Sequence, residues 1–150
     1  MRGVIDKEID IKRKPEVVFD YCSDYSHEPE WNIRMKHVQK LSPGPVGVGT
    51  RYEMELVPGR TITSECVSFD RPRAWRMEGS ALGMNMAMAG RVTPTSEGAH
   101  LVLETEFAAG SLRGVAIPFI RRRMWPELER DIHTIKAILE EGDPSDSSAS

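Results

Sequence analysis

The feature that most constrains this chain is a series of short segments in which apolar and polar residues alternate. In the segment "RYEMEL" (residues 51–56), Tyr52, Met54 and Leu56 have one parity, and the residues between them are charged. Alternation with a period of two is typical of a strand with one buried face. Similar segments occupy residues 4–11, 74–80, 84–92 and 100–107, and strands with less regular faces are expected at 33–41 and 60–70. Turn-rich stretches separate them, which favours an antiparallel sheet.

The C-terminal segment follows a different period. Between residues 119 and 141, apolar residues recur at steps of four and three, at Ile120, Met124, Leu128, Ile132, Ile135 and Leu139. This spacing places them in one stripe and predicts a long amphipathic helix. Pro126 lies inside the pattern and is expected to kink the helix or to mark its true start.

Two shorter helices are expected between the first and second strands. Residues 15–22 begin with proline and carry apolar residues at helical spacing, and residues 26–32 are too short for more than one turn. The order of elements therefore predicts an α+β fold. In it, a seven-stranded curved antiparallel sheet grips the long C-terminal helix.

Composition excludes several classes of protein. The chain has 150 residues, the usual size of one domain, and its net charge of −3 includes no extensive basic face, so nucleic acid is not an expected partner. No apolar run resembles a signal peptide or a membrane span. Cys22 and Cys66 fit no metal or redox spacing. We therefore expect a cytoplasmic protein with reduced thiols, no metal and no cofactor; the oligomeric state stays open.

Four segments, in this order, resemble a known superfamily. They are "KPEVVFDYCSDYSHEPEWN", "GPVGVGTRYEME", "SFDRPRAWRMEG" and the C-terminal amphipathic helix. Together they resemble the START-like (SRPBCC) superfamily, most closely its small bacterial members of the polyketide cyclase/dehydrase type. The resemblance implies a helix-grip domain at residues 1–141, with an apolar cavity between the concave sheet face and the long helix. Residues 142–150 contain no large apolar residue and are expected to form a disordered tail.

The stretch "SHEPEWN" (residues 26–32) offers two interpretations. A metal site needs three or four converging ligands, whereas His27 and Glu28 are neighbours that would point apart on a helix. We therefore expect a surface position for His27. In proteins similar to this one the segment is the second short helix, so the resemblance implies that Trp31 is buried where the helices meet the sheet.

Methionines are the main independent sign of a cavity, because this flexible side chain suits a surface that adapts to a ligand. The alternative is that they fill an ordinary core. The predicted ligand-binding residues are Tyr52, Met54, Glu65, Trp75, Met77, Met84, Met86, Met88, Phe107, Met124 and Leu128.

Three polar residues are candidates for contact with a ligand, and for two of them a position outside the cavity is also open. Tyr52 has the inward parity and a hydroxyl group. Glu65 shares its parity with Thr63 and Phe69; if that face is inward, Glu65 is a buried carboxyl with a raised pKa, whereas a strand bulge would turn it to solvent. Asp131 lies at the edge of the helical stripe and either enters the cavity or pairs with an arginine.

The sequence contains no nucleophile elbow, phosphate-binding loop, dinucleotide fingerprint or zinc spacing. The first hypothesis is therefore a binder of a hydrophobic or aromatic small molecule, lipid- or polyketide-like. The second is a cyclase/dehydrase-type enzyme that uses acids and bases of the cavity, and the third is a chaperone module for a protein or a quinone. A buried carboxyl or tyrosine within reach of a second polar group would favour the enzyme. Catalytic residues stay unassigned.

Overall fold

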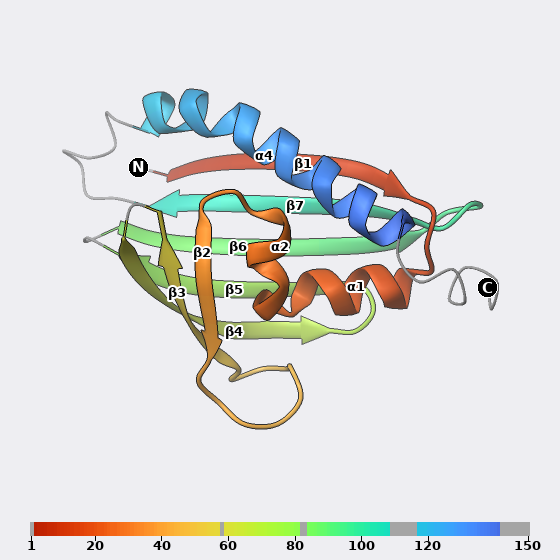
Figure 1. Ribbon diagram of the computed structural model, residues 1–150, viewed down its shortest axis with the longest axis horizontal. Helices are drawn as coiled ribbons and strands as arrows, with labels where there is room; N and C mark the ends of the chain where they lie inside the picture. Colours follow the sequence, from red (N-terminus) through yellow and green to blue (C-terminus); the bar gives the residue numbers. More distant parts are fainter. Residues whose placement is uncertain (1, 58, 82–83, 109–116, 142–150) are drawn as a thin grey trace.

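The computed structural model describes residues 2–57, 59–81, 84–108 and 117–141. Seven strands of these residues form one antiparallel sheet in the order β1-β7-β6-β5-β4-β3-β2 (Figure 1). They are β1 (Arg2–Ile11), β2 (Met35–Lys40), β3 (Arg51–Leu56), β4 (Arg60–Asp70), β5 (Ala74–Ala81), β6 (Met84–Pro94) and β7 (Ala99–Ala108). The predicted fold class is confirmed. The tail expected at 142–150 lies outside the described residues.

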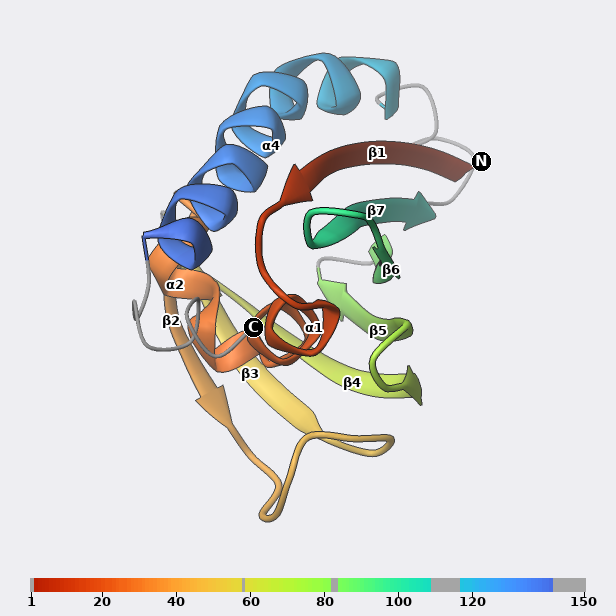
Figure 2. The same ribbon diagram turned by 90° about the vertical axis from the view of Figure 1, so that its right-hand side faces the viewer.

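The helices lie on the concave side of this sheet. Two helices and a 3₁₀ turn separate β1 from β2, and a long helix follows β7; they are α1 (Pro15–Ser23), η1 (Tyr25–His27), α2 (Glu28–Trp31) and α4 (Ile117–Glu140). Figure 2 shows the strands curling around α1 and α2, with α4 across the open side of the curve. Pro126 is inside α4 rather than at its start. No described helix is both long and apolar enough to span a membrane.

The packed core occupies one end of the concave face. Phe19 of α1 lies edge-on to Trp75 of β5, with ring centroids 5.4 Å apart, and Ile135 and Leu139 of α4 belong to the same buried cluster. Trp75 fits there because its neighbour in β6 is Gly90, where a Cβ atom would lie 2.1 Å from the indole ring. The side chains of this end therefore fill the space between the sheet and the helices.

Polar contacts with β1 hold α4 along its length. The Lys7 ammonium, on the inner face of β1, donates to Glu129 at 2.6 Å and lies 3.1 Å from the centroid of the Trp125 ring. Further along, the Lys136 ammonium donates to the Asp10 carbonyl at 2.7 Å. These contacts set the position of α4 over the sheet.

A bulge in β4 reverses the parity of this strand. Ile62, Ser64 and Cys66 face inward, and the register then shifts between Cys66 and Ser68. The extra residue, Val67, is exposed, and Phe69 returns to the inner face. Glu65 consequently lies on the exposed outer face, so its predicted place in the cavity is wrong.

Trp31 and His27 take the expected positions. Trp31 is 7% exposed and belongs to the core cluster between the helices and the sheet. The side chain of His27 is 39% exposed, with Nδ1 3.3 Å from Glu30 Oε2. Trp31 thus anchors the C-terminal end of the one-turn helix α2 in the core.

We expect Trp31→Ala to lower the free energy of unfolding by about 3–5 kcal/mol, because truncating a large buried aromatic side chain leaves a cavity. The measurement is urea denaturation followed by circular dichroism. Val48→Ala is the control: Val48 is 71% exposed, and its truncation should change stability by less than about 0.5 kcal/mol. Wild-type stability of the Trp31 variant would contradict its role as an anchor.

Candidate functional site

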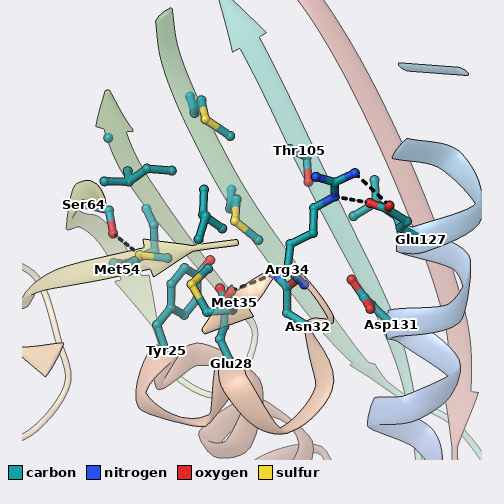
Figure 3. A pocket seen from close by; sticks show the side chains of 17 residues that line it. Tyr25, Glu28, Asn32, Arg34, Met35, Met54, Ser64, Thr105, Glu127 and Asp131 are labelled. Carbon is teal, nitrogen blue, oxygen red and sulfur yellow. Dashed lines mark hydrogen bonds and ion pairs between the residues drawn. The ribbon is translucent and has the colours of Figure 1, made fainter. Parts of the chain in front are cut away.

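A cavity of about 140 Å³ lies at the other end of the concave face, between the sheet, the α2–β2 turn and the middle of α4 (Figure 3). Its lining is mainly apolar. The described apolar lining residues are Met35, Met54, Leu56, Ile62, Met77, Met86, Met88 and Leu128. The polar ones are Tyr25, Glu28, Asn32, Arg34, Ser64, Thr105, Glu127 and Asp131.

The cavity brings together only part of the predicted ligand-binding set. Met54, Met77, Met86, Met88 and Leu128 line it, and their contact with a ligand stays a prediction. For Tyr52, Trp75 and Phe107, parity identified the buried face of the sheet but not the position along the strand.

Three buried candidates are neighbours of lining residues rather than part of the lining. Tyr52, Trp75 and Phe107 are buried but are not among the described lining residues. The Tyr52 hydroxyl donates to Asp24 Oδ1 at 3.3 Å, and the Trp75 indole N–H donates to the Tyr25 hydroxyl at 3.3 Å. These groups support the packing of η1. The side chains of Met84 and Met124 lie outside the described parts of the structure.

Glu28 is the residue of this site that the sequence did not reveal. It is 0% exposed, and its Oε2 accepts a hydrogen bond from Asn32 Nδ2 at 3.0 Å. Its Oε1 is buried and has no hydrogen-bond partner among the described residues. Burial raises the pKa of Glu28 to about 7; the Asn32 hydrogen bond lowers it in part, and the charge of Asp131 raises it further.

The local fold explains why Glu28 points inward. Tyr25, Glu28 and Trp31 follow one another at intervals of three residues, and all three are buried. Side chains three residues apart lie on one side of a tight helical turn, so Glu28 shares the buried face with two aromatic residues. The three-residue spacing was the feature of the sequence from which the burial of Glu28 could have been predicted. Figure 3 shows the Glu28 side chain extending from α2 into the cavity, between Tyr25 and Asn32.

Asp131 supplies a second acid to the cavity from α4. It is 3% exposed, and its Oδ1 accepts a hydrogen bond from the Ile33 N–H at 3.4 Å. Burial raises the pKa of Asp131 to about 6, against the opposing effects of that hydrogen bond and of Arg130. Of the two alternatives for Asp131, the structure favours the cavity.

An ion pair connects the α2–β2 turn to α4 beside these acids. The Arg34 guanidinium donates through Nη2 to Glu127 Oε1 at 2.9 Å, and its Nε is bonded to Glu127 Oε2. The hydrogen bonds to Glu127 raise the pKa of Arg34. Both hydrogen bonds of the Arg34 guanidinium go to Glu127, and the charge of Arg34 also lowers the pKa of Asp131 in part.

The arrangement suits apolar binding and proton transfer. Among the described residues, no three His, Cys, Asp or Glu side chains are grouped so that they could hold a metal ion. Glu28 can hold or release a proton near neutral pH, beside the apolar lining of the cavity.

We expect the protein to be less stable at pH 8 than at pH 5.5, with a contribution of about 2 kcal/mol from Glu28. The pKa of Glu28 rises from 4.5 to about 7 on folding, so the folded state holds this proton more tightly. The resulting stabilisation is present below pH 4.5 and is lost as the pH rises through 7. Urea denaturation at both pH values should show a smaller difference for Glu28→Gln. Glu65→Gln, on the outer face, should keep the wild-type difference. The same difference in stability between the two pH values in all three proteins would contradict the burial of a titrating Glu28.

Comparison with solved structures shows the same fold in several enzymes. The Zhui aromatase/cyclase from Streptomyces sp. R1128 has a TM-score of 0.73 at 15% identity, over 91% of this chain and 93% of that chain. A truncated norcoclaurine synthase from Thalictrum flavum has a TM-score of 0.70 at 17% identity, over 95% of this chain and 96% of that chain.

The di-domain aromatase/cyclase StfQ of the steffimycin biosynthetic pathway is also similar, with a TM-score of 0.73 at 16% identity, over 93% of this chain and 51% of that chain. A search of curated protein sequences gave no match. The family model described as polyketide cyclase / dehydrase and lipid transport matches residues 2–140. The chain therefore belongs to the polyketide cyclase/dehydrase and lipid transport family.

Proposed function

We propose that the protein binds an apolar small molecule, of the size of one ring, in the cavity between the sheet and α4. The observation that carries this proposal is a mainly apolar space of about 140 Å³ between the sheet and α4. An engineered cavity of roughly 150 Å³, lined by apolar side chains, accepts benzene. A lipid- or polyketide-like ligand would place one ring or a short chain segment here.

The side chains around this space support binding over dense packing. Met86 and Met88 are only half-buried although they face the helix side of the sheet, and both line the cavity. Methionine has three rotatable bonds and a polarizable sulfur, so such a wall adjusts to ligands of different shape. Membership in a family named for cyclases, dehydrases and lipid transport agrees with this function.

A second candidate function is acid–base catalysis in the same cavity, and Glu28 favours it specifically. A buried carboxyl lies 3.0 Å from the Asn32 amide and has a pKa of about 7. Cyclisation and dehydration both begin with removal of a proton beside a carbonyl group, and such a carboxylate is a suitable base at neutral pH. In this mechanism Glu28 takes a proton from carbon, and the resulting acid returns it to the ligand or passes it to water.

We expect toluene to bind with a dissociation constant of about 0.2 mM or weaker, because the entropy cost of association reduces the gain from burial. Burial of about 200 Å² of apolar surface is worth about 5 kcal/mol before entropy costs. The measurement is a titration followed in ¹H–¹³C spectra of protein labelled at its methionine methyl groups. Signals of Met54, Met77, Met86 and Met88 should shift.

The matched variants fill either the cavity or the opposite face. Thr105→Leu enlarges a buried lining residue and should weaken toluene binding at least about tenfold. Thr63→Leu makes the same change at an exposed position of β4 and should bind as the wild type does. Absence of methionine shifts in the wild type would refute the proposed function.

The catalytic candidate predicts exchange of the methyl protons of acetophenone with solvent deuterium. Glu28 would remove a proton from the carbon beside the carbonyl, exchange it with solvent and return a deuteron. Glu28→Gln should reduce the protein-catalysed rate at least about 100-fold, the usual contribution of a general base, without loss of toluene binding. A rate in the wild type equal to that of buffer alone would leave the protein a binder and exclude this chemistry for acetophenone.

A further inference from the structure

One buried polar atom of the cavity lacks a partner. Glu28 Oε1 is inaccessible to solvent and accepts no hydrogen bond from the described residues, whereas Oε2 is bonded to Asn32. A buried polar group without a partner is unfavourable by about 1–3 kcal/mol, and more when it is charged. A ligand that brings a hydrogen-bond donor to Oε1 would remove this cost.

The charges of the lining indicate which donor fits best. Glu28, Asp131 and Glu127 are acidic, and the basic residue among the described lining residues is Arg34. Arg34 is bonded to Glu127 through two nitrogen atoms, so neither Glu28 nor Asp131 has a hydrogen-bonded cation among the described residues; the charges of Arg130 and Arg34 act on Asp131 only. When both acids are ionised, the cavity carries an excess of negative charge in an apolar setting, where a ligand cation is strongly favoured.

We propose that the ligand of this cavity is a ring-bearing amine, whose protonated nitrogen donates to Glu28 Oε1 and faces Asp131 while its ring packs among the methionines. This inference rests on the proposed function, because it assigns the polar end of the same ligand. It also gives the two acids complementary roles: Glu28 provides the acceptor atom that has no partner among the described residues, and Asp131 adds charge from another element, α4.

The inference requires a definite dependence on pH. Glu28 interacts with Tyr25 of η1, Asn32 of the turn and Asp131 of α4, and Arg34 and Glu127 complete the charged lining of the cavity. An amine such as benzylamine stays protonated between pH 5.5 and 8, whereas Glu28 and Asp131 lose their protons within this range. Binding of the amine should therefore tighten as the pH rises, and binding of an uncharged ligand should change little.

The experiment compares four ligands of similar shape on the full wild-type chain, by titration of the methionine methyl signals at pH 5.5 and pH 8. The ligands are toluene, benzyl alcohol, benzylamine and benzoate. At pH 8 we expect benzylamine to bind about tenfold more tightly than toluene or benzyl alcohol, as for one charge-assisted hydrogen bond. At pH 5.5 this advantage should largely disappear.

Two variants test the assignment to Glu28. Glu28→Gln should remove the advantage of benzylamine over toluene while toluene still binds, and Glu65→Gln, an exposed carboxyl of β4, should retain it. The comparison of ligands in the wild type does not depend on the variants, so the inference remains testable if Glu28→Gln fails to fold.

The outcomes separate the two proposals. Binding of toluene without any preference for benzylamine would overturn the amine inference and leave the proposed function intact. Equal binding of benzyl alcohol and benzylamine would show that Glu28 needs only a neutral donor, and tighter binding of benzoate would show that Arg34 governs recognition; either result overturns the inference. If none of the four ligands shifts the methionine signals, both proposals fail.

Discussion

The placement of α4 across the open side of a strongly curved sheet is the constraint on which the rest of the structure depends. A curved sheet leaves a concave face longer than α1 can cover, and the aromatic core around Phe19 and Trp75 fills only one end of it. At the other end, α4 is held by its contacts with the edges of the fold, through Lys7 to Glu129 and Arg34 to Glu127. These polar contacts set the distance of α4 from the sheet. The apolar side chains of α4 and of the sheet therefore do not have to pack against each other at this end, and a cavity remains between them.

Much of this architecture could be predicted from the sequence, because alternation and helical spacing report directly on burial. The inward positions of Met77, Met86 and Met88 followed from parity, and α4 from a stripe that ends at Leu139. Parity failed in β4, where a bulge at Val67 reverses the faces and places Glu65 outside. Such a bulge depends on pairing with β5, which no local pattern encodes.

The cavity itself was harder to predict, since parity contains no information about position along a strand. Tyr52 and Met54 share one face of β3, but only Met54 lines the cavity; Tyr52 reaches Asp24 beside η1. Glu28 was missed for a related reason. A glutamate is usually solvated, and in a helix of four residues the sign of its burial is limited to the three-residue spacing from Tyr25 and Trp31.

Burial of Glu28 is costly for the fold, and the position of the residue suggests why it is tolerated. The Trp31 side chain, three residues further along the same short helix, anchors α2 in the core, so the orientation of the turn is fixed by apolar packing rather than by the carboxyl. Asn32 satisfies one oxygen, and Asp131 raises the energy of the ionised form further. A carboxyl that is held in place by its neighbours, while its own charge is destabilised, gains free energy from any ligand that supplies a donor or a proton acceptor. The destabilised ionised form of Glu28 therefore favours both ligand binding and proton transfer at this position.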